Sequence, residues 1–151
     1  MALAVQTLVT TAPRRRIEQP VEDQLGITVL FTSVELTINA LKTAGELASR
    51  LNAQIMLLVP QVVPYPLPLS SPPVLVEFNE RRFSVIAELS RVATHVQVYL
   101  CRDRWIALES VLAPHSLIVV GVRNRWWPTR DMRLAAKLRR AGHEVVLATT
   151  E

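Results

Sequence analysis

The stretch that decides the fold is SLIVVGVRNRWWPTRDMRLAAKLRRAGHE, residues Ser116 to Glu144. Its opening run, SLIVV, indicates a strand covered on both faces. Gly121 follows the run, where a tight turn tolerates a residue without a Cβ atom. Thr129 can cap the helix that comes next, and Gly142 is expected to end that helix. The stretch therefore predicts a buried strand, a turn and a basic helix.

Strands and helices are expected to alternate through the rest of the chain. Further strands are predicted at Ile27–Ser33, Gln54–Val63, His95–Cys101 and Glu144–Thr150, and further helices at Glu35–Asn52, Val74–Ala93 and Arg102–Ala113. Strict alternation of this kind predicts a parallel sheet with helices on both faces. The proline-rich segment Pro64–Pro73 is expected to be a stiff crossover, with peptide recognition as the alternative.

The hydrophobic pattern of each strand predicts its place in the sheet. The first, second and fourth strands are the most apolar and are expected at the centre, whereas the third alternates as edge strands do. With right-handed crossovers, this predicts an open five-stranded parallel α/β sheet in the order 3-2-1-4-5. Ligands of such sheets bind beyond the carboxyl ends of the strands where the strand order reverses. Here those ends are Thr32–Ser33 and Gly121–Arg125.

The 151 residues are expected to form one domain behind a tail. Residues 1–24 show no sustained hydrophobic period, which predicts a flexible N-terminal tail and a domain over residues 25–151. No apolar run is long enough to span a membrane, so no membrane association is expected. Cys101 is the only cysteine, which excludes an internal disulfide and predicts a reducing, cytoplasmic location.

The loop after the fourth strand concentrates side chains that could bind a ligand. The candidate binding residues are Thr32, Ser33, Gly121, Arg123, Asn124, Arg125, Trp126, Trp127, Thr129 and Arg130. Arginines hold phosphate or carboxylate groups through paired hydrogen bonds, and tryptophans stack on rings or bases. One interpretation is a sensor for an anionic small molecule, for example a nucleotide gripped by side chains. In the alternative, Trp126 and Trp127 plug the site and pack on neighbouring helices.

Other kinds of site find less support. No two of the three histidines have the spacing of metal ligands, so we expect no metal and no cofactor. The sequence contains no nucleophile elbow and no Lys-Ser/Thr phosphate loop, so an enzyme is not favoured. The last predicted helix carries a basic stripe made of Arg130, Arg133, Lys137 and Arg140. Because no aromatic residues interleave the stripe, a solvated surface is favoured over a nucleic-acid interface.

The chain resembles the universal stress protein family, within the adenine-nucleotide hydrolase-like fold, from about Gly26 to Thr150. LIVVGVRNR (Leu117–Arg125) resembles the family's fourth strand and phosphate loop, and LRRAGHEVVLA (Leu138–Ala148) resembles its final helix and strand. In ATP-binding members an aspartate ends the first strand, and a Gly-x2-Gly-x9-Gly-Ser/Thr loop wraps the phosphates. Glycines let backbone amides approach phosphate closely in such loops.

The sequence departs from the ATP-binding pattern at several positions. Thr32 stands at the place of the aspartate, and Asn124 stands at the place of the second glycine. Gly121 matches the first glycine, but no glycine occurs between Gly121 and Gly142. The resemblance therefore implies a divergent member with a regulatory or interaction role that does not bind ATP in the usual way. Family members commonly pair through the last strand, which implies a homodimer through Glu144–Thr150.

Overall fold

The computed structural model describes residues 6–10, 25–63, 81, 85–86, 88 and 94–150. In chain order, the elements are β1 (Gln6–Thr10), β2 (Gly26–Leu30), α1 (Val34–Leu51), β3 (Gln54–Val62), β4 (Thr94–Cys101), α3 (Arg104–Val111), β5 (Leu117–Arg123), α4 (Arg130–Arg140) and β6 (Glu144–Thr150). The proline-rich segment Pro64–Pro73 lies outside the described residues. The helix expected at Val74–Ala93 lies almost entirely outside them.

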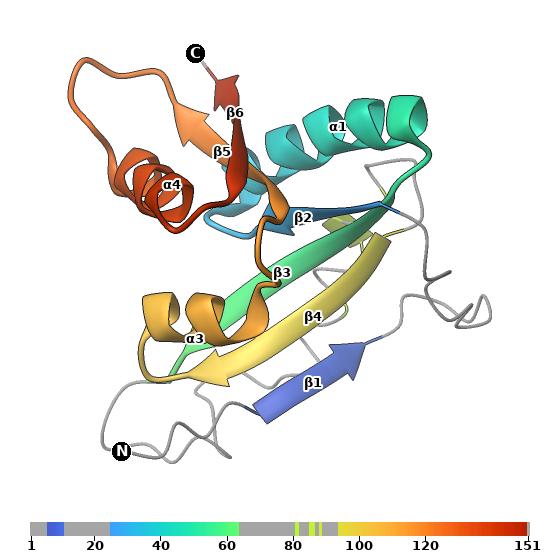
Figure 1. Ribbon diagram of the computed structural model, residues 1–151, viewed down its shortest axis with the longest axis vertical. Coiled ribbons are helices and arrows are strands. Elements are labelled where there is room, and N and C mark those ends of the chain that lie inside the picture. Colours follow the sequence, from blue (N-terminus) through green and yellow to red (C-terminus); the bar gives the residue numbers. More distant parts are fainter. Residues whose placement is uncertain are drawn as a thin grey trace.

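The predicted parallel sheet is confirmed. The strand order is β1-β4-β3-β2-β5-β6, so the five strands β2 to β6 follow the predicted order 3-2-1-4-5. Every pairing among these five strands is parallel. Strands β2 and β5 are neighbours at the centre, and the chain turns towards opposite edges of the sheet from that point (Figure 1).

A sixth strand, β1, extends the sheet at the edge formed by β4. It pairs antiparallel with β4, from Gln6 opposite Leu100 to Thr10 opposite Val96. The sequence pattern predicts a tail over these residues, because a five-residue run carries too little periodicity to identify a strand. Strand β4 is therefore the edge of the parallel part of the sheet, but it is not the edge of the whole sheet.

Two apolar clusters, one on each face of the sheet, form the described core. One contains Ile27 and Val29 of β2 and Val119 of β5, together with the alanine-rich face of α1. The other contains Leu30 and Ile118 with the inward residues of α3 and α4. Because successive residues of a strand point to opposite faces, neighbouring residues of β2 and β5 divide between the clusters. Helices therefore cover both faces, as the sequence predicts.

The position of Gly121 differs from the turn that the sequence predicts. It lies inside β5, opposite Ala148 of β6, and not at a turn. A Cβ atom at this position would lie 2.2 Å from the carbonyl oxygen of Leu36 in α1. The glycine is therefore required because the first turn of α1 packs directly on the backbone of β5. Gly142 does have a left-handed φ of 97° just after α4, as expected for a residue that ends a helix.

Candidate functional site

The carboxyl ends of β2 and β5 lie side by side where the strand order reverses. The residues after β2 mainly form hydrogen bonds with the first turn of α1. Ser33 is the N-cap, and its hydroxyl accepts a hydrogen bond from the backbone N–H of Leu36 at 3.4 Å. The backbone N–H of Thr32 donates to Thr37 Oγ1 at 3.2 Å. The hydroxyl of Thr32 is buried and has no hydrogen-bond partner in the described part of the chain.

The residues after β5 form a projecting loop that lines an open cavity. We call Arg123–Trp127 the Arg/Trp loop, and these five residues line a cavity of about 530 Å³. The loop extends away from the sheet between β5 and α4 (Figure 1). Its base is held by the backbone N–H of Asn124, which donates to the carbonyl oxygen of Thr150 at 2.9 Å. A ligand entering this cavity would meet two guanidinium groups, an amide and two indole rings.

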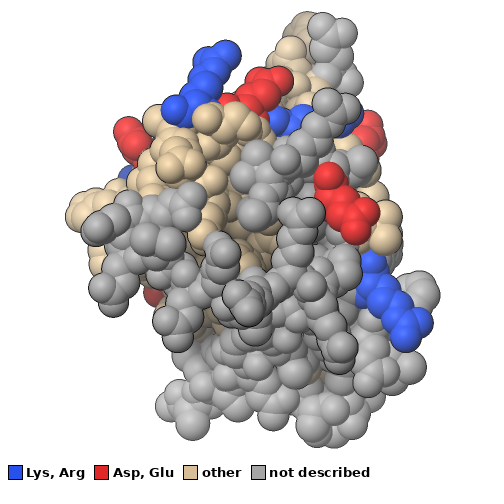
Figure 2. Space-filling view, turned by 90° about the vertical axis from the view of Figure 1, so that its right-hand side faces the viewer, with Lys and Arg blue, Asp and Glu red and all other residues tan. Residues whose placement is uncertain are grey.

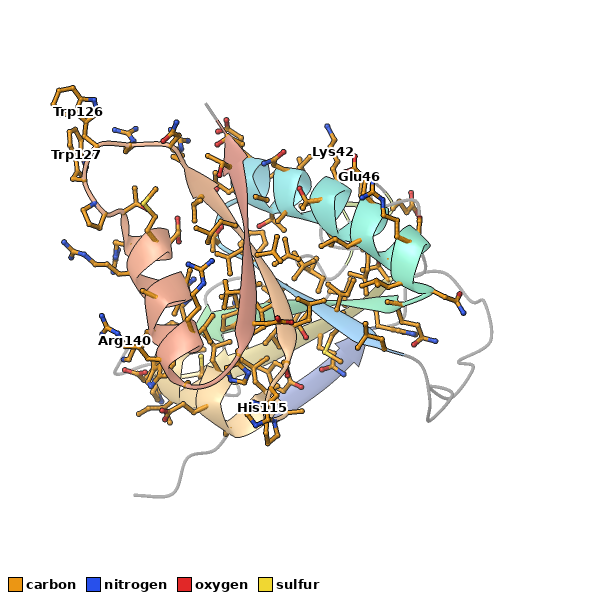
Figure 3. The ribbon with its side chains drawn as sticks, turned by 45° about the horizontal axis from the view of Figure 1, so that its top comes forward. Lys42, Glu46, His115, Trp126, Trp127 and Arg140 are labelled. Carbon is orange, nitrogen blue, oxygen red and sulfur yellow. The ribbon has the colours of Figure 1, made fainter. Side chains whose placement is uncertain are left out.

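The two tryptophans of the loop are exposed. Trp126 is 100% exposed and Trp127 is 62% exposed. Figure 3 shows both side chains at the outer end of the loop. They do not plug the site by packing on neighbouring helices, which was the alternative that the sequence left open. The guanidinium carbon of Arg125 lies 6.0 Å from the centroid of the Trp127 ring, at the outer limit of a cation–π contact.

An ion pair joins the Arg/Trp loop to α1. Arg123 Nη2 donates to Glu35 Oε2 at 3.0 Å. The two side chains are 47% and 69% exposed, so water and ions reach the pair. Sequence reasoning did not include Glu35 among the site residues. Its position two residues after the end of the first predicted strand was the available signal.

The remaining predicted site residues lie at the start of α4 or inside the sheet. Thr129 is the N-cap of α4, and its hydroxyl accepts from the backbone N–H of Met132 at 3.2 Å. Arg130 opens the helix and is exposed. Thus the cavity lining unites five of the ten candidates, while Thr32, Ser33, Gly121, Thr129 and Arg130 lie outside that lining. Ligand contacts by these outer residues stay a prediction.

A partly buried guanidinium lies near the first turn of α4. Burial lowers the pKa of Arg104, and the opposing effect of nearby Asp131 only partly offsets it. Two of its nitrogens, Nε and Nη2, are buried without a hydrogen-bond partner among the described residues. Sequence reasoning assigned no role to Arg104, because its burial arises from the packing of α3 and not from any local pattern.

The opposite end of the sheet holds the histidines. His115 lies far from Trp126 and Trp127 in Figure 3. His143 Nδ1 accepts a hydrogen bond from the backbone N–H of Ser116 at 3.1 Å, so this ring has a structural role within the chain. The described residues contain no group of three or more His, Cys, Asp or Glu side chains that could hold a metal ion. No helix among them is long and apolar enough to cross a membrane.

Surface charge on the side away from α4 is mixed. Figure 2 shows basic and acidic side chains interspersed over the described part of that face. The basic stripe predicted on α4 is exposed, and one of its members, Lys137, has its ammonium nitrogen 4.2 Å from the centroid of the Trp105 ring. The lysine thus packs against α3 as well as facing solvent.

Comparisons with known proteins identify the fold. No protein-family model matches the sequence, and no curated protein matches it. The chain is similar to the crystal structure of a universal stress protein in complex with cAMP, with a TM-score of 0.53 and 16% sequence identity. The similarity covers 82% of this chain and 95% of that chain. The fold is therefore universal-stress-protein-like.

Proposed function

We propose that the protein is a cytoplasmic regulatory or interaction module of the universal stress protein type, without catalysis and without the usual mode of ATP binding. The fold supports a module of this type. A free cysteine, Cys101, fits a reducing compartment.

The observation that carries this proposal is the role of Gly121. Its missing Cβ is explained by the approach of the Leu36 backbone, so this glycine does not indicate a phosphate loop. The following loop positions carry side chains, with Asn124 where the ATP-binding pattern has its second glycine. Side chains at such positions obstruct the close contact between backbone amides and phosphate. Thr32, at the place of the aspartate, has a neutral side chain.

A second candidate function is a sensor for an anionic small molecule. The exposed tryptophans and the arginines of the Arg/Trp loop favour it, because together they offer a stacking surface and positive charge around one cavity. The universal stress protein of similar fold was crystallised with cAMP, which is an anionic nucleotide. Cyclic AMP and AMP are therefore the first probes to test on this chain.

Mass spectrometry of ligands retained on the native protein, followed by titration of tryptophan fluorescence, tests both proposals. We expect cAMP or AMP to change the emission in a saturable way, and Trp126→Ala with Trp127→Ala to abolish that change. Trp105→Phe is the matched control, because Trp105 lies on α3 outside the cavity lining. Micromolar binding of ATP with magnesium would contradict the first proposal, and no saturable binding of any nucleotide or retained anion would contradict the second.

The proposed assembly is a homodimer through β6. This strand closes one end of the described sheet and pairs there with β5. The backbone N–H of Glu144 donates to Ser116 on the β5 side, so alternate residues Val145, Leu147 and Thr149 direct their backbone groups outward. One outward group is already in use, since Arg139 Nη2 donates to the Val145 carbonyl oxygen at 2.8 Å.

The oligomeric state of a proline variant tests the dimer. Thr149→Pro removes an outward N–H donor and is expected to give a monomer by light scattering. Thr149→Ala keeps the donor and is expected to remain dimeric. Circular dichroism checks that both variants are folded. A monomeric wild-type protein, or a dimeric proline variant, would place β6 outside any interface.

A further inference from the structure

We propose that Glu35 is a built-in competitor of the ligand for Arg123 and thereby sets the affinity of the Arg/Trp loop for anions. The inference rests on the proposed sensor function of that loop. In the absence of ligand, the carboxylate of Glu35 occupies the guanidinium that a phosphate would need. A ligand anion must displace this carboxylate before it can make the same contact.

The contact geometry supports an exchangeable pair. Arg123 Nη2 and Glu35 Oε2 are 3.0 Å apart, a charge-assisted hydrogen-bond distance. Arg123 is both a partner in this pair and a residue of the cavity lining. Because both side chains are about half exposed or more, the pair is weak enough for an incoming anion to replace.

Rigid backbones bring the two residues together. Glu35 precedes Leu36, whose carbonyl oxygen lies against Gly121, and Gly121 is two residues before Arg123 in β5. Ser33 caps the same turn of α1. The separation of the two backbones is therefore determined by close packing, so the ion pair does not depend on a chance meeting of two mobile loops.

Glu35 also lies where a negatively charged group is electrostatically favoured. It lies in the first turn of α1, where the partial positive charge of the helix N-terminus favours a negative group. Its carboxylate therefore takes the place at the Arg123 guanidinium that the ligand anion would occupy. Arg125, the second arginine of the cavity, forms no ion pair among the described residues. It remains available for the first contact with ligand.

A positioning role for Glu35 predicts the opposite effect. If the carboxylate holds Arg123 in the orientation that the ligand needs, removal of its charge weakens binding. Competition instead predicts that the charge-neutral variant binds more tightly. The sign of the change in Kd therefore separates the two roles.

The experiment measures the Kd of cAMP and AMP by tryptophan fluorescence for matched variants. Glu35→Gln removes the charge but keeps a hydrogen-bond acceptor, and we expect a Kd about two- to fivefold lower, the range given by exposed ion pairs. Glu46→Gln makes the same charge change on α1 away from the loop, as Figure 3 shows, and is expected to leave the Kd unchanged. Arg123→Gln is expected to raise the Kd. In that background, Glu35→Gln is expected to have no further effect.

Each outcome decides a separate point. An unchanged or higher Kd for Glu35→Gln, with clear binding by the wild type, overturns the competition while the sensor function stands. Tighter binding that persists in the Arg123→Gln background shows a general charge effect and also overturns it. If neither the wild type nor Glu35→Gln binds, the sensor function itself fails and the inference fails with it. Circular dichroism confirms that each variant is folded.

Discussion

Substitution of Gly121 by alanine tests the contact that locks α1 to the sheet. The added Cβ would lie 2.2 Å from the carbonyl oxygen and 2.7 Å from the carbonyl carbon of Leu36. These are backbone atoms, so no side-chain rotation relieves the clash. The first turn of α1 would have to retreat by about 1 Å to restore an ordinary contact, a distortion typical of overpacked cores.

The expected cost is about 2 kcal/mol, within the range observed for overpacking. For a chain of this size, that loss lowers Tm by about 4–8 °C. Thermal denaturation followed by circular dichroism measures the change. Gly26→Ala is the matched control, because nothing lies within 4 Å of its Cβ position, and we expect it to be neutral or stabilising by about 0.5 kcal/mol. Equal Tm values for the two variants would refute the packing argument.

Three further substitutions or probes test other contacts. Thr37 is fully buried, and its hydroxyl accepts a hydrogen bond from the backbone N–H of Thr32. Thr37→Val is therefore expected to lower the free energy of unfolding, measured by urea denaturation, by about 1–3 kcal/mol. A smaller loss would mean that water replaces the hydrogen bond. Cys101 is 1% exposed, and burial raises the pKa of its thiol. A disulfide reagent is therefore expected to react with this thiol only after unfolding. Rapid reaction of the native protein would contradict this expectation. Lys137→Gln removes the cation above the Trp105 ring and is expected to cost about 0.5–1 kcal/mol, whereas an unchanged denaturation midpoint would show that the contact contributes nothing.

The parallel sheet could be predicted because its signals are local. The apolar runs of β2 and β5 are each followed by a helix with a capping residue, Ser33 before α1 and Thr129 before α4. Alternating elements then leave few arrangements of the strands. Strand β1 could not be predicted in this way, because QTLVT is a strand only by pairing with β4, about ninety residues later in the chain.

Part of the candidate site could be predicted because its residues are also local in the sequence. The Arg/Trp loop follows directly from the end of a recognisable strand, so its residues are contiguous in the sequence. The partner of Arg123 is 88 residues away, and only the packing of α1 on β5 brings Glu35 to it. Gly121 illustrates the same limit. A glycine in a sequence has several explanations, and the choice among them depends on what approaches it in three dimensions.

The pairing of β1 with β4 has a consequence for how copies of this chain can grow into larger assemblies. A sheet with an unpaired strand at each edge can pair with another copy at both edges. Identical copies can then add indefinitely into a fibre. Here the two edges of the described sheet are β6 and β1, and β1 is a strand of only five residues. Two copies joined through β6 about a two-fold axis would each pair the other's β6 edge. Growth beyond such a pair would have to continue at β1, and a short edge strand offers few backbone groups for it.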